Sequence, residues 1–243
     1  MQFQAPESLS EQIAQHIGQQ IVVGRLQPGE RIQELRVAGE LNVSRGSVRE
    51  ALLILQRRHL VEIYPRKGAA VSELTPQTVN SLYDIYINLL QMLVRGLIDV
   101  TEGSDLIPLI QKIRELDRLI EEDASATESI MEAGFGVMRM AYRLVDNPFL
   151  EETLENFRPA ISRTYHIAIV NVSDGVSDTR RFFERLSAAA AERDQQALAA
   201  AISDFGERQR ARVLDALAEE TAHDDRSVSS ARPDEASFVQ SRP

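Results

Sequence analysis

The stretch from Leu41 to Leu55 constrains the fold of this chain more than any other segment. Ser44 is a good N-cap residue, and an apolar face follows at Val48, Leu52 and Leu55. This pattern predicts an amphipathic helix with one buried side and a polar side that is rich in arginine and serine near its N-terminus. Such a helix can enter a DNA major groove, and an ordinary amphipathic helix with solvated arginines is the alternative.

The segments on both sides predict the rest of a small domain. A helix over residues 8–24, a turn at residues 28–29 and a short helix over 34–41 precede the stretch. Strands over 61–64 and 69–72, joined by a tight turn, follow it. Helices and hairpin in this order predict a winged helix-turn-helix. The hairpin tip carries Arg66, Lys67 and Gly68, which suit contact with a phosphate backbone or a minor groove.

The distribution of charge restricts any nucleic-acid surface to this domain. The chain has 243 residues and a net charge of −10, but the residues up to 75 sum to +1 and the remainder to −11. The acidic remainder would repel phosphate. The sequence has no cysteine, no signal peptide and no apolar run of transmembrane length, which predicts a cytoplasmic location without a membrane partner.

From Thr75 to about residue 220 the chain reads as helices only. Apolar periodicity predicts helices over about 76–100, 104–122, 127–145, 148–171, 175–192 and 194–218, with short breaks between them. Long helices with short joins favour an antiparallel bundle. The expected fold is therefore mainly α, with a winged helix-turn-helix over 1–74 and an all-helical effector-binding and dimerisation domain over 75–220. The polar tail over 221–243 is expected to be disordered.

The first domain closely resembles the DNA-binding domain of GntR-family bacterial regulators. The resemblance rests on Leu26-x-Pro28-Gly29-x-x-Ile32, on Leu41-Asn42-Val43-Ser44-Arg45-Gly46-Ser47-Val48-Arg49-Glu50-Ala51-Leu52, on Leu60-Val61 and on Arg66-Lys67-Gly68-Ala69-x-Val71. It implies DNA contacts by Ser44, Arg45, Gly46, Ser47, Arg49 and Gly68, and the candidate DNA-binding residues further include Arg36, Arg66 and Lys67. One departure is that relatives of the fatty-acid regulator carry the second-helix arginine at the position of Leu35, whereas here it is Arg36.

The second domain resembles the effector domain of the FadR-type subfamily (an FCD-like domain). The resemblance rests on Leu82-Tyr83-Asp84-Ile85, on Asn147-Pro148-Phe149-Leu150 and on the final helix pair, which is broken at Asp194. Many relatives bind a divalent metal there through one aspartate and three histidines. Here the corresponding positions align with Gly134, Met138, Phe183 and Phe205, and a shifted register gives Glu132 and Gly136 for the first two. Neither register restores the ligand set, so no metal and no cofactor are expected. A two-ligand site at His166 with a carboxylate is the alternative.

These replacements leave two interpretations of the second domain. Either an apolar pocket takes a larger, metal-independent effector such as an acyl chain, or the side chains fill the pocket and the domain only dimerises. The arginine with which relatives hold a carboxylate aligns with Tyr86. The candidate pocket residues are Tyr86, Met138, Arg163, Phe183 and Phe205, with Arg95 and Tyr165 as further polar candidates.

The sequence thus predicts a homodimeric transcription regulator, acting as a repressor, that binds a palindromic double-stranded operator and responds to a small effector. A ligand-independent DNA-binding scaffold is the alternative. An enzyme is not expected, because the sequence contains no nucleophile–base pairing, no glycine-rich phosphate loop and no metal ligand set.

Overall fold

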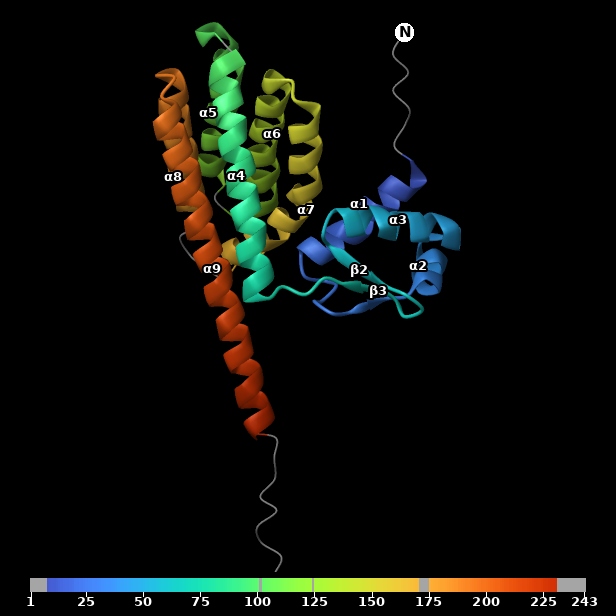
Figure 1. The fold of residues 1–243 in the computed structure, drawn as a ribbon. Helices are drawn as coiled ribbons and strands as arrows, with labels where there is room; N and C mark the ends of the chain where they lie inside the picture. The colour runs from blue at the N-terminus through green and yellow to red at the C-terminus, as the bar shows by residue number, and fades with distance from the viewer. Residues whose placement is uncertain (1–7, 101, 124, 171–174, 231–243) are drawn as a thin grey trace, which may run out of the picture.

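The computed structural model describes residues 8–100, 102–123, 125–170 and 175–230, in which a group of short helices and strands lies beside a bundle of long helices (Figure 1). The N-terminal domain begins with α1 (Leu9–Val22), α2 (Glu34–Leu41) and α3 (Arg45–Arg57). Ser8 caps α1 by accepting a hydrogen bond from the amide of Glu11. Asn42 adopts a left-handed conformation with φ of 52° and so makes the tight turn between α2 and α3.

A three-stranded antiparallel sheet completes this domain. The strands β1 (Arg31–Ile32), β2 (Val61–Tyr64) and β3 (Gly68–Val71) lie in the order β1-β3-β2. The hairpin was predicted, whereas β1 was not, because a two-residue strand has no periodicity of its own. Ile32 pairs with Ala69, and its buried side chain joins the core under α1 and α3.

The C-terminal domain is a bundle of long helices, as the periodicity predicted. It contains α4 (Pro76–Val100), the short 3-10 helix η1 (Gly103–Leu106), α5 (Ile107–Glu122), α6 (Thr127–Val145), α7 (Pro148–Val170), α8 (Gly175–Ala191) and α9 (Gln195–Ser230). The red helix α9 runs beside α4 (Figure 1). The fold class is therefore confirmed: a mainly α chain with a small sheet in its winged domain. The break expected near residues 173–174 lies outside the described residues.

The predicted disorder of the tail from residue 221 is wrong for its first part. Helix α9 continues to Ser230, well below the body of the bundle in Figure 1. The segment after Gly206 contains neither glycine nor proline until Pro233, so nothing in its backbone chemistry ends the helix near residue 220. Residues 231–243 lie outside the described part of the chain.

The two domains dock through α1 on one side and α7 on the other. Gln19 of α1 donates a hydrogen bond from Nε2 to Oε1 of Glu128 at the start of α6, over 2.6 Å. The ring of His59, just after α3, stacks on Phe157 of α7 with centroids 4.9 Å apart. The orientation of the winged domain is thus fixed by polar and aromatic contacts with the bundle.

Candidate nucleic-acid interface and bundle cavity

The N-terminus of α3 presents polar groups to the outside of the winged domain. Ser44 caps the helix, since its Oγ accepts a hydrogen bond of 3.0 Å from the amide of Ser47. The two serine hydroxyls lie 2.8 Å apart. Val48, Leu52 and Leu55 of the same helix are buried, as their spacing predicted. Because the apolar face is packed inward, the first turn of α3 keeps its amides and hydroxyls at the surface, where a phosphate can bind.

The two arginines of this turn differ in their surroundings. Arg45 donates from Nε to Oε2 of Glu34 on α2 over 2.6 Å, so its guanidinium is held against the preceding helix while the side chain stays largely exposed. Arg49 is exposed, and no hydrogen bond or ion pair joins its side chain to another residue in the described part of the chain. Sequence reasoning named both arginines but not Glu34, which orients one of them.

Gly46 is not required by the fold of α3. A Cβ built at this position would meet only the Oγ of Ser44, at an ordinary 3.6 Å, and the φ angle of Gly46 is not positive. The absence of a side chain therefore leaves open space at the surface of the helix. This is the arrangement that lets a ligand approach the backbone closely.

The tip of the hairpin is exposed and basic, as predicted. Tyr64 pairs with Gly68 across the strands, so Pro65, Arg66 and Lys67 form the loop. Arg66 and Gly68 have φ angles of 64° and 82°, and at Gly68 this conformation favours glycine. The wing thus projects two cations from a tight turn on the same domain as the N-terminus of α3.

The structure places Arg36 apart from these residues. Its Nε lies 3.0 Å from Oε1 of Glu40 on the outer side of α2, and it lines a hollow together with His16 and Gln20 of α1. Two positions separate it from Glu34, the residue that touches Arg45, which turns it to another side of the helix. The geometry therefore does not group Arg36 with the other predicted DNA contacts.

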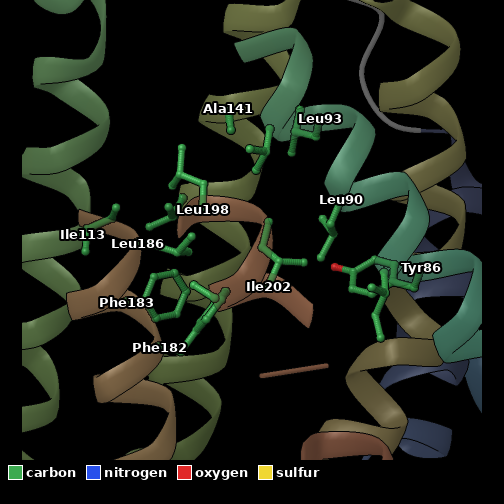
Figure 2. Close-up of a cluster of buried hydrophobic side chains, with 14 of the residues drawn as sticks. Tyr86, Leu90, Leu93, Ile113, Ala141, Phe182, Phe183, Leu186, Leu198 and Ile202 are labelled. Atoms are coloured by element: carbon green, nitrogen blue, oxygen red, sulfur yellow. The ribbon is translucent and has the colours of Figure 1, made fainter. Parts of the chain in front are cut away.

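A narrow cavity of about 80 Å³ lies inside the bundle. Side chains from α4, α6, α7, α8 and α9 line it, and most of them are aromatic or aliphatic. Figure 2 shows Tyr86 of α4, Phe182 and Phe183 of α8 and Ile202 of α9 in the interior of the bundle. The rings of Phe182 and Phe205 stack with centroids 4.1 Å apart, so much of the wall is aromatic.

Four of the five predicted pocket residues line this cavity, and the fifth does not. Tyr86, Met138, Phe183 and Phe205 are in its wall. Three positions that the resemblance aligned with metal ligands (Met138, Phe183 and Phe205) therefore do meet there, and Gly134, the fourth, lines it as well. The described residues contain no group of three or more carboxylate, histidine or cysteine side chains that could hold a metal ion.

Arg163, the fifth predicted pocket residue, lies at the domain boundary instead. It is 4% exposed, and its Nη1 donates a 2.7 Å hydrogen bond to the carbonyl of Ser72, directly after the wing. Burial lowers the pKa of Arg163 to about 10, which still leaves it charged at neutral pH. The sequence around Arg163, four residues after Pro159, does not predict this contact, because its partner Ser72 lies 91 residues away in the sequence. Arg95 is exposed on α4 and is also outside the cavity wall.

The polar groups of the cavity are neutral. The hydroxyls of Tyr165 and Thr179 lie 2.8 Å apart, and those of Tyr83 and Thr164 lie 3.1 Å apart. Burial raises the pKa of Tyr83 to about 12 and that of Tyr165 further. Tyr165 had been only a secondary candidate. The phenols therefore remain protonated at physiological pH and add no charge to the wall.

Gln209 is a buried polar residue of the cavity wall that sequence reasoning missed. It is 1% exposed, and its Nε2 faces Oδ2 of buried Asp178 at 3.4 Å; the partly exposed Arg208 and Arg212 pair with the same carboxylate. Its Oε1 has no hydrogen-bond partner among the described residues. A glutamine on a long amphipathic helix usually faces solvent, so no local signal distinguishes this one.

Residues 9–71 match the model of a protein family described as bacterial regulatory proteins, gntR family. The match covers α1 to β3, which are the helices and strands of the winged domain. Within the described residues, no helix is both long and apolar enough to cross a membrane.

Relatives with similar sequences are transcription regulators rather than enzymes. An HTH-type transcriptional regulator of Bacillus subtilis, YdhC, is 34% identical over 107 residues, which is 44% of this chain and 48% of YdhC. The gluconate operon transcriptional repressor of the same organism is 28% identical over 61% of this chain and 60% of its own length. The chain thus spans about half the length of the first of these relatives and three fifths of the second.

Solved structures of similar fold extend over both domains. McbR/YncC of Escherichia coli has a TM-score of 0.69 at 22% identity, with 86% of this chain and 99% of that chain covered. A GntR-type transcriptional regulator from Rhodococcus has a TM-score of 0.65 at 19% identity, with the same coverage. At these identities the likeness establishes the arrangement of winged domain and helical bundle.

Proposed function

We propose that this chain, whose N-terminal domain is that of the gntR regulators, is a homodimeric, sequence-specific DNA-binding repressor of the FadR-type subfamily that acts in the cytoplasm. The observation that carries the proposal is the exposed N-terminus of α3, where Ser44, Ser47 and Arg49 face outward above a packed apolar face. In this geometry α3 enters a major groove, with Arg45 and Arg49 reaching base edges or phosphates. The basic wing tip then lies against the backbone of the adjacent groove.

A second copy of the chain supplies the second half-site of a palindromic operator. Support comes from α4, whose exposed side carries Ile85 and Met92 at 50% and 54% exposure, seven residues apart on one face. Pairing through this face would bury both side chains. The gluconate operon repressor, one of the similar proteins, carries the word repressor in its name, and that supports the direction of regulation.

The cavity is the proposed effector site of this regulator, and it acts without a metal ion. An effector that binds better to one arrangement of bundle and winged domain shifts the population toward it and so changes DNA affinity. The alternative function, a ligand-independent DNA-binding dimer, is favoured by the small volume of the cavity, about 80 Å³. A long acyl chain needs more space than that, so the acyl-type effector is the weaker version of the proposal.

Selection of binding sequences from random duplexes, followed by fluorescence anisotropy on the enriched operator, tests the DNA-binding function. Arg49→Ala should lower specific affinity, with a loss of about 1–3 kcal/mol per bidentate base contact, and leave the helical circular dichroism unchanged. Arg95→Ala removes an exposed arginine from the bundle and serves as the matched control. Unchanged operator affinity in Arg49→Ala and Arg45→Ala would refute the assignment of α3 as the recognition helix.

A further inference from the structure

The wall of the bundle cavity selects against charged ligands. Among the described residues that line it, none carries a charged side chain at neutral pH. Moving a carboxylate or an ammonium group from water into such a site without a partner is strongly unfavourable. The stacked rings of Phe182 and Phe205, with Phe183 edge-on to the first of them, instead offer faces and edges to a second aromatic ring.

The side-chain oxygen of Gln209 in the cavity wall is a hydrogen-bond acceptor without a donor among the residues that the structure describes. Because Nε2 of Gln209 faces the carboxylate of Asp178, the amide is oriented with its oxygen on the other side, and that Oε1 has no partner. A buried acceptor without a donor destabilises the site that contains it. The hydroxyls of Tyr165 and Tyr83 do not satisfy it, since they lie against Thr179 and Thr164. A ligand hydroxyl group would supply the missing donor.

The size of the cavity sets the size of the ligand. A dry cavity of about 150 Å³ holds benzene in an engineered protein, so the 80 Å³ here must widen to nearly twice its volume for a single ring. Met131 and Met138 in its wall can give way, because methionine has three rotatable bonds and adapts its shape at low cost. Two rings or a long chain would require displacement of the helices themselves.

The cavity also adjoins the boundary between the domains. Met131 and Phe135 line both the cavity and a polar cleft of about 550 Å³ between α1 of the winged domain and helices α6 and α7. Phe135 carries the guanidinium of Arg158 over its ring at 5.7 Å, and Arg158 lines the cleft too. A ligand that moves Phe135 therefore acts directly on the surface against which α1 docks.

We propose that the effector is an uncharged, single-ring aromatic compound with a hydroxyl group, of the size of phenol. Its ring packs among the phenylalanines, its hydroxyl donates to Oε1 of Gln209, and it enters from the interdomain cleft past Met131 and Phe135. This inference rests on the proposed function only in taking the cavity as a regulatory site, and it names the class of ligand.

Isothermal titration and thermal shift of the full-length protein with phenol, toluene and benzoate test this inference. Toluene replaces the hydroxyl of phenol by a methyl group of similar size, and benzoate adds a negative charge. Phenol should bind about ten-fold more tightly than toluene, and benzoate should bind more weakly than either. Equal affinities for phenol and toluene, tightest binding by benzoate, or no saturable binding of phenol would overturn the proposal.

The variant Gln209→Met keeps the length of the side chain and removes the acceptor. It should bring the affinity for phenol down to that for toluene, and a preserved preference in this variant would contradict the role of Gln209. The ranking in the unmodified protein stands by itself if the variant does not fold. Operator binding measured without ligand separates this test from the proposed function, because a protein that binds its operator but ignores phenol refutes only the ligand class.

Discussion

Replacing Arg163 by methionine should loosen the contact between the winged domain and the bundle while leaving the stability of the fold almost unchanged. The guanidinium is buried, and burial lowers its pKa from 12.5 to about 10, which corresponds to about 3 kcal/mol of desolvation. Its hydrogen bond of 2.7 Å to the carbonyl of Ser72 contributes about 1.5–3 kcal/mol, the range for a charged donor. The two terms nearly cancel.

Methionine retains most of the packing, and water can reach the carbonyl of half-buried Ser72 once the arginine is gone. We therefore expect the free energy of unfolding in urea to change by less than about 1 kcal/mol. Cleavage by a glutamate-specific protease at Glu73, in the segment between β3 and α4, should nevertheless become several-fold faster. Arg95→Met, at an exposed position of the same bundle, is the matched control and should change neither quantity.

Two results would refute this reasoning. A loss of more than about 3 kcal/mol in unfolding free energy would mean that the contacts of Arg163 outweigh its desolvation by far. An unchanged cleavage rate at Glu73 would mean that the hydrogen bond to Ser72 does not hold the domains together.

Two further predictions concern the wing and the domain boundary. Gly68→Ala should destabilise the protein by about 1–2 kcal/mol, because Gly68 has a φ of 82° that alanine adopts only with strain. Gly39→Ala, in open space on α2, should stabilise the protein by about 0.5–1 kcal/mol. Urea denaturation measures both changes, and equal effects of the two variants would contradict the backbone argument. Burial lowers the pKa of His59 below 6.5, so the folded state binds fewer protons than the unfolded state and loses stability as the pH falls below 6.5. His59→Asn, which tolerates the φ of 57° and does not titrate, should reduce that loss between pH 7.5 and 5.5, and an identical pH profile would exclude the histidine as its source.

Interactions between residues close together in the sequence allow the fold to be predicted from the sequence. Ser44 caps α3, Asn42 supplies the left-handed turn before it, and the spacing of Val48 and Leu52 decides which face of α3 is buried. Each of these effects depends on neighbours within a few residues, so the pattern alone predicts it. The same holds for the wing, where the turn and Gly68 determine the hairpin.

The contacts that decide function across the bundle were not local. Arg163 was expected in the pocket but reaches Ser72, and Gln209 was not considered but lines the cavity beside Asp178. The sequence by itself therefore determined the cap and buried face of α3, the hairpin of the wing and the apolar character of the side chains at the cavity positions. Only the tertiary structure decided which polar side chains face the cavity and which join the domains, because that depends on how helices distant in sequence rotate against one another as they pack.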